Sequence, residues 1–170
     1  MTSAATITIR PMRLEDLPVV MEIEASCYTE IAPESHECLG AKLSSSPSTC
    51  FVVCKGAEIA AFLISHPIQF ESPPQLHALL CPVPDHADTL YLHDLAVAPT
   101  YRGCGAGRLL MNTFISKIKE LKFKRASLIA VQDSYDYWRR FGFNPVDVTG
   151  PLKDKLASYG RAARYMEWKI

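Results

Sequence analysis

Apolar and polar positions along the chain repeat with two different periods, which separate expected strands from expected helices. Residues 7–10 alternate, as a half-buried strand does. The apolar runs 50–54 and 58–65 flank the turn Lys55-Gly56, a pattern that predicts a hairpin. Further strands are expected at 89–98, 126–131 and 165–170. Helical spacing predicts helices at 13–27, 34–43, 105–121 and 134–141.

Residues 67–88 follow neither period and are rich in proline. We expect a long loop there, which is either a tolerated insertion or a wall of a binding site. The stretch 157–165 is ambiguous between helix and loop. At 170 residues without repeats, the chain predicts one domain, residues 1–170, of mixed α/β class with a sizeable core.

The most specific local motif follows the strand expected at 89–98. The sequence Arg102-Gly103-Cys104-Gly105-Ala106-Gly107 stands between that strand and an apolar helix. Glycines let backbone N–H groups approach an anion closely, and the unpaired amides at a helix N-terminus face the same anion. The order strand, glycine loop, helix therefore predicts a phosphate cradle.

Two common phosphate loops are excluded by residue identity. A P-loop needs Gly-Lys-Ser/Thr five residues after its first glycine, where this chain has Arg108. The dinucleotide fingerprint G-x-G-x-x-G fails at the same residue, because its third glycine would also be Arg108. What remains is Arg-x-x-Gly-x-Gly, or a glycine-rich helix start that binds nothing.

The pattern carried by Arg102, Gly105 and Gly107 resembles the pyrophosphate loop of the GNAT N-acetyltransferase superfamily. The order of expected elements resembles the GNAT fold over nearly the whole chain. The resemblance implies a mixed, mostly antiparallel sheet of six to seven strands, with helices on both faces. It also implies a splayed cleft between strands 89–98 and 126–131 that admits acetyl-CoA, and direct attack of an amine on the thioester without a metal.

The resemblance also implies which residues bind the cofactor. Strand backbone would hold the acetyl and pantetheine portions, and the loop amides would hold the pyrophosphate, aided by arginine charge. The implied cofactor-binding residues are Leu95, Ala96, Val97, Arg102, Gly103, Cys104, Gly105, Ala106, Gly107, Arg108, Ser134 and Trp138. Ser134 also has the residue type that caps a helix N-terminus.

Two side chains of the central strand are candidates for the catalytic base. Tyr91 and His93 alternate and are expected on one face, with Asp94 on the other. An imidazole with a pKa of about 6.5 accepts protons near neutral pH, although His93 is equally compatible with a structural role. The segment 93–97, with the later Trp-Arg-Arg-Phe-Gly-Phe, resembles the arylalkylamine N-acetyltransferase branch. That branch carries two alternating histidines, and Tyr91 replaces the first.

The general acid is less clear from the sequence. In many GNAT enzymes a tyrosine donates a proton to the leaving thiolate, and Trp138 stands at that position here. An indole only donates a hydrogen bond and is no practical proton source. Helical spacing places Tyr135 nearer to the face of Trp138 than Tyr137, which favours Tyr135 as the acid. Tyr137, water, or a packing role for all three side chains are the alternatives.

The composition restricts the classes of partner that the protein is expected to bind. The formal net charge is zero and no basic stripe occurs, so we expect no nucleic acid. No apolar run reaches the roughly 20 residues of a membrane span and no leader-like stretch occurs, which predicts a cytoplasmic protein without a membrane partner. The six cysteines and five histidines show neither disulfide nor metal spacing.

Three functions are compatible with these features. We expect an acetyltransferase acting on the primary amine of a small molecule, as a monomer or homodimer. A protein N-terminal or lysine acetyltransferase is the first alternative. A non-catalytic sensor that binds acyl-CoA is the second.

Overall fold

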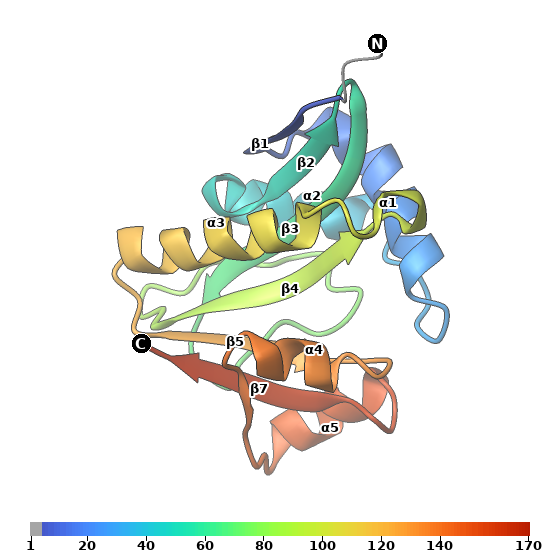
Figure 1. Ribbon diagram of the computed structural model, residues 1–170. Coiled ribbons are helices and arrows are strands. Elements are labelled where there is room, and N and C mark those ends of the chain that lie inside the picture. The colour runs from blue at the N-terminus through green and yellow to red at the C-terminus, as the bar shows by residue number, and fades with distance from the viewer. Residues whose placement is uncertain (1–4) are drawn as a thin grey trace.

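A single seven-stranded sheet organises the molecule, in the computed structural model that describes residues 5–170 (Figure 1). The strand order is β1-β2-β3-β4-β5-β7-β6, and every neighbouring pair is antiparallel except β4 and β5. The strands are β1 (Ile7–Pro11), β2 (Phe51–Lys55), β3 (Glu58–Ile68), β4 (Thr89–Val97), β5 (Arg125–Ala130), β6 (Asn144–Pro145) and β7 (Arg164–Lys169). The predicted fold, a mixed and mostly antiparallel sheet, is confirmed.

Five α-helices cover the two faces of this sheet (Figure 1). They are α1 (Leu17–Cys27), α2 (His36–Ser45), α3 (Ala106–Glu120), α4 (Tyr135–Arg140) and α5 (Pro151–Ser158). One face packs against α3 and α4 through a core that includes Leu110, Phe114 and Trp138. The opposite face packs against α1 and α2 through residues such as Leu17 and Leu39. Among the described residues, no helix combines the length and apolarity needed to cross a bilayer.

The sheet opens where β4 meets β5. Their parallel pairing covers only Leu90–Leu92 against Ala126–Leu128, although β4 continues to Val97. Residues beyond Leu92 therefore have no partner in β5, and the predicted splay between these two strands is confirmed.

A β-bulge in β4 changes the expected direction of one side chain. The register pairs Ile64 with Asp94 and Ser65 with Leu92, so one step in β3 faces two steps in β4 and His93 is the extra residue. The bulge breaks the alternation of faces, and the side chains of His93 and Asp94 both lie on the side of α1. The expectation that Asp94 faces away from His93 is therefore wrong.

The C-terminal part of the fold differs most from the sequence-based expectation. Helix α5 was not predicted, and β6 is only two residues long. The α5 sequence PLKDKLAS is mostly polar and buries only Leu152, so its apolar period is too weak to recognise. Helix α3 buries a stripe that includes Leu110, Met111 and Phe114, whereas Leu121, just after the helix, is exposed.

Candidate functional site

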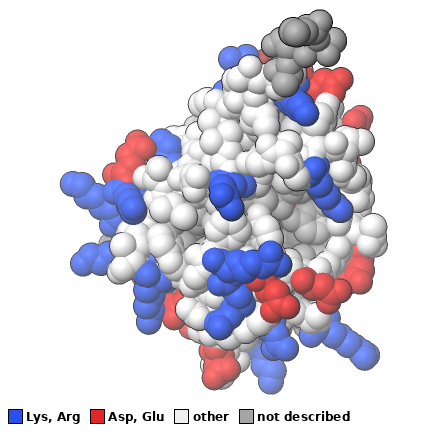
Figure 2. Space-filling view, in the orientation of Figure 1, with Lys and Arg blue, Asp and Glu red and all other residues white. Residues whose placement is uncertain are grey.

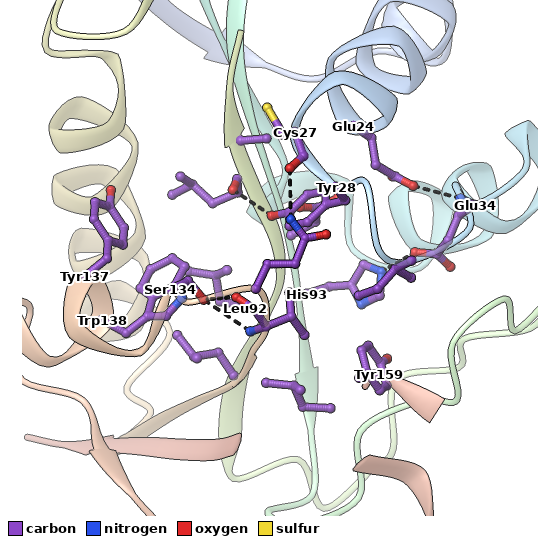
Figure 3. A pocket seen from close by; sticks show the side chains of 18 of the residues that line it. Glu24, Cys27, Tyr28, Glu34, Leu92, His93, Ser134, Tyr137, Trp138 and Tyr159 are labelled. Atoms are coloured by element: carbon purple, nitrogen blue, oxygen red, sulfur yellow. Dashed lines mark hydrogen bonds and ion pairs between the residues drawn. The ribbon is translucent and has the colours of Figure 1, made fainter. Parts of the chain in front are cut away.

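A cavity of about 380 Å³ lies in the splay between β4 and β5. Its walls come from both strands, from α4, from the connection between α1 and α2, and from residues near α5. Figure 3 shows Tyr137 and Trp138 on one side of it and Glu34, His93 and Tyr159 on the other. Figure 2 shows the same face of the molecule hollowed, with Lys and Arg side chains around the hollow. The cavity therefore has two ends of different chemistry.

The first end lies against the N-terminus of α3. Gly105 precedes the helix with a φ of 89°, a left-handed conformation that favours glycine. A Cβ on Gly107 would lie 3.2 Å from the Tyr137 hydroxyl and 3.6 Å from a Val97 methyl, so this glycine permits close approach of the helix to the cavity wall. The N-terminus of a helix carries unpaired amides and the positive end of the helix dipole. Binding of a pyrophosphate at this loop stays a prediction.

The other loop residues take different positions around this cradle. Arg102 lines the cavity, whereas the side chain of Arg108 is exposed and does not line it. Gly103 has a φ of 81°, Cys104 is a half-buried free thiol, and the side chain of Ala106 is buried in the core beneath the helix. Arg102 is thus the arginine placed to add charge within the cleft.

The backbone of Leu95, Ala96 and Val97 lines the middle of the cavity. The Tyr28 hydroxyl donates to the carbonyl of Leu95 at 3.0 Å, and the Cys27 thiol donates to the carbonyl of Val97 at 3.3 Å. Strand β5 provides no hydrogen-bond partner for these two carbonyls. The last residue of α1 and the residue after it provide the partners instead. These two hydrogen bonds fix the position of this stretch of strand along the cavity.

Helix α4 brings a tyrosine to the cleft, but not the one that helical spacing favoured. Tyr137 and Trp138 line the cavity, whereas Tyr135 borders a different hollow beside Arg164. This placement reverses the expected preference for Tyr135. Burial raises the pKa of the Tyr137 hydroxyl, so it is protonated at neutral pH.

Ser134 also behaves differently from the expected helix cap. Its hydroxyl donates to the carbonyl of Val131 at 2.6 Å and accepts from the Val131 amide at 3.1 Å, and it makes no capping bond to α4. It closes the turn between β5 and α4 and still lines the cavity.

The second end of the cavity is built around a buried ion pair. Glu34 accepts a hydrogen bond from the Lys42 ammonium at 2.8 Å through one oxygen and contacts Nε2 of His93 through the other. The side chain of Lys42 is fully buried and that of Glu34 is 4% exposed. The amide of His77 donates to Glu34 at 3.3 Å, and Leu76 lines the cavity, so the 69–88 loop forms a wall of the site.

The protonation states follow from these contacts. Burial alone would raise the pKa of the Glu34 carboxyl, but His93 and Lys42 together hold it well below its ordinary value. Burial lowers the pKa of His93, and Glu34 opposes that shift only in part. The imidazole is therefore neutral at pH 7. With Nε2–H donating to the carboxylate, Nδ1 keeps a free lone pair.

Two further carboxyl groups lie at this end. Glu24 is 5% exposed and Asp94 is 7% exposed, and both line the cavity. One oxygen of Glu24 accepts from the amide of Glu34 at 2.7 Å. Burial raises the pKa of both carboxyl groups. The negative charge of Glu34 raises both further, and that of Glu24 also raises the pKa of Asp94.

Tyr91 is the predicted site residue that the fold places elsewhere. Its ring lies 6.1 Å from that of His93, measured between centroids, so the two side chains share a face as expected. Tyr91 is 1% exposed, however, and packs with Ile68, Leu152 and Tyr165 rather than lining the cavity. This candidate base therefore lies outside the cavity.

Sequence reasoning missed most of the second end. Lys42 lies between Leu39 and Leu43 at helical spacing, and a charge on a buried stripe is a signal that was available. Glu24 lies on the buried face of α1, next to Ile23. Glu34 and Tyr159 stand in irregular segments without a local pattern, and only the tertiary fold brings them to His93.

Comparison with known proteins identifies the family. The acetyltransferase (GNAT) family matches residues 17–143, which is most of the chain. The chain therefore belongs to the acetyltransferase (GNAT) family, a family of acetyl-CoA-dependent N-acetyltransferases. This membership agrees with the cradle at α3 and with the predicted cosubstrate.

Three similar proteins illustrate the range of the match. A [ribosomal protein bS18]-alanine N-acetyltransferase of Haemophilus influenzae is 36% identical over 64 residues, which cover 36% of this chain and 43% of that protein. A putative enzyme of the same kind from Bacillus subtilis is 26% identical over 81% of this chain and 80% of its own length. The crystal structure of the PaiA N-acetyltransferase from Thermoplasma acidophilum, in complex with coenzyme A, has a TM-score of 0.69. The two sequences are 17% identical, and the match covers 97% of this chain and 99% of the PaiA chain. This is a likeness in fold.

Proposed function

We propose that this protein transfers the acetyl group of acetyl-CoA to the primary amine of a small molecule, with His93 as the general base. The observation that carries the proposal is one continuous cavity that extends from Arg102, beside the glycine loop, to the free Nδ1 of His93. One ligand can reach from Arg102 along Leu95–Val97 and present its acyl group beside the imidazole.

The reaction needs a neutral amine and a protonated leaving group. Acetyl-CoA, when bound, supplies an activated acetyl group as a thioester. Nδ1 of His93 takes a proton from the acceptor ammonium, either directly or through water, and Glu34 stabilises the charge that this creates on the imidazole. The neutral amine then forms the new C–N bond while the C–S bond breaks.

Tyr137 takes the role of general acid in this proposal. Its hydroxyl stands between α3 and the cavity wall and remains protonated at neutral pH, so it has a proton for the thiolate. Trp138 packs edge-on against Tyr137, with ring centroids 4.9 Å apart, and shapes the wall for the pantetheine arm. The tryptophan thus orients the neighbouring tyrosine without itself giving a proton.

A small acceptor suits the second end of the cavity. Leu76, Tyr159 and the connection between α1 and α2 surround His93, and the 69–88 loop joins α5 through a 2.8 Å hydrogen bond from Lys155 to the carbonyl of Pro73. An acceptor must therefore fit between these segments. Acetylation of a protein N-terminus is the second candidate, because the relatives from H. influenzae and B. subtilis carry that name.

A thiol-release assay with acetyl-CoA tests the proposal against both alternatives. The acceptors are arylalkyl and alkyl amines, free amino acids, and short peptides that begin with alanine. We expect release with amines and none with peptides. Release with peptides alone would establish the protein acetyltransferase instead. Binding of acetyl-CoA in calorimetry without release on any acceptor would indicate a sensor.

A further inference from the structure

Unpartnered polar atoms gather at the second end of the cavity. Six buried side-chain oxygen or nitrogen atoms of the described residues lack a hydrogen-bond partner, and four of them belong to residues that line this cavity. They are Oε2 of Glu24, Nδ1 of His93, Oδ1 of Asp94 and the hydroxyl of Tyr159. Each side chain is more than nine-tenths buried. Buried polar atoms are normally satisfied, so this concentration indicates a ligand rich in hydrogen-bond donors.

Charge along the cavity points to the same kind of ligand. Arg102 lines the phosphate end, whereas Glu24, Glu34 and Asp94 line the opposite end. Glu34 is already occupied by Lys42, His93 and the amide of His77. Glu24 and Asp94 have no cation of their own among the ion pairs of residues 5–170. A cationic ligand would supply the missing charge.

The carboxyl groups of Glu24 and Asp94 are poorly suited to bind the nitrogen that attacks the thioester. A carboxylate in contact with an ammonium raises the pKa of that ammonium, which opposes the deprotonation that attack on a thioester requires. Neutral His93, in contrast, can accept the proton. The carboxyl pair therefore suits a nitrogen that stays protonated throughout the reaction.

Resting on the proposed function, we propose that the acceptor is a small diamine whose second, unreactive ammonium binds between Glu24 and Asp94 while its reacting amine faces His93. The two carboxyl groups are then specificity-determining residues. Amines that carry a carboxylate are repelled from the same end.

Three acceptors of similar length test the proposal: pentylamine, its diamine counterpart cadaverine, and aminovaleric acid, which carries a carboxylate. We expect kcat/KM for cadaverine to exceed that for pentylamine at least tenfold, as a charge-assisted hydrogen bond provides, with aminovaleric acid the poorest. Glu24→Gln and Asp94→Asn should each bring the cadaverine-to-pentylamine ratio toward one, mainly through KM. Glu22→Gln, on the exposed side of the same helix, is the matched control and should keep the parent ratio.

The outcomes separate the two proposals. Equal kcat/KM for cadaverine and pentylamine in the parent enzyme would overturn the ammonium site and leave the acetyltransferase proposal standing. If no amine is acetylated, the ammonium site is tested by calorimetry, in which cadaverine is titrated into the enzyme loaded with coenzyme A. Binding that weakens at least tenfold in Asp94→Asn would support the site, and absence of binding would overturn it.

Discussion

The two ends of the cavity are built by different means. The phosphate end consists of backbone groups from one stretch of chain, from β4 to the first turn of α3, and its key residues are glycines. The acceptor end consists of side chains from α1, α2, the 69–88 loop, β4 and the region after α5. The contrast separates a proposed cosubstrate site that local sequence encodes from a proposed acceptor site that distant segments assemble.

The ends also differ in electrostatics. At the phosphate end, Arg102 and the glycines before α3 are exposed, and the helix dipole places partial positive charge there. At the acceptor end, buried carboxyl groups, one lysine and one histidine set each other's protonation. Substitutions at the first end should therefore change affinity for acetyl-CoA. Those at the second should change chemistry, acceptor choice or stability.

Loss of the base should have the largest effect. We expect His93→Gln to lower kcat by about 10²–10⁴-fold, the range for general base catalysis, with the Kd for acetyl-CoA unchanged in calorimetry. Burial lowers the pKa of His93 below its ordinary 6.5. The parent rate should accordingly fall as the pH drops through that lowered value and the imidazole becomes charged, and the variant should lack this limb. An unchanged pH–rate profile would exclude His93 as base. His36→Gln, on the surface, is the control.

Removing the buried lysine should cost stability. Lys42→Met leaves the Glu34 carboxylate without its ammonium in a buried site, which typically costs about 3–5 kcal/mol. Urea unfolding measures the loss, and Lys119→Met on the exposed side of α3 is the control. Adding Glu34→Gln to Lys42→Met should restore part of the stability. If Lys42→Met and Lys119→Met unfold at the same urea concentration, the ion pair does not stabilise this end of the cavity.

Strain in the cradle should affect only the phosphate end of the cavity. A β-branched side chain at the left-handed Gly105 distorts the loop, and we expect Gly105→Val to raise the Kd for acetyl-CoA by about 100-fold through lost backbone hydrogen bonds. Gly160 has a φ of 108° and no atom near its missing Cβ, so Gly160→Val introduces similar strain outside the cradle. Equal weakening in both variants would show that strain, rather than the cradle, determines affinity.

The general acid should matter least, because a thiol with a pKa of about 8.5 leaves readily and water can protonate it. We expect Tyr137→Phe to lower kcat by about tenfold with little change in the Kd for acetyl-CoA. Tyr135→Phe should have no effect, since that side chain borders another hollow. Equal thiol-release rates for the parent, Tyr137→Phe and Tyr135→Phe would indicate that water protonates the leaving thiolate.

The sequence predicted more of the first end than of the second. Arg102, Gly105 and Gly107 form a contiguous pattern whose geometry is local, so family and cradle followed from the residues. Tyr137 was ranked below Tyr135 because ideal helical spacing ignores where a short helix docks. The roles of these side chains, and the likeness to the arylalkylamine branch, remain predictions.

The sequence by itself determined the order of strands and helices up to α4, the glycine loop and the family, because periodicity and backbone conformation are properties of neighbouring residues. Only the tertiary structure decided that Glu24, Glu34, Lys42, His93 and Asp94 meet in one site. A single extra residue in β4 turns His93 and Asp94 to the same face, and irregular segments carry Glu34 and Tyr159 to them. Neither event leaves a periodic trace in the sequence, since both depend on contacts between segments that are far apart along the chain.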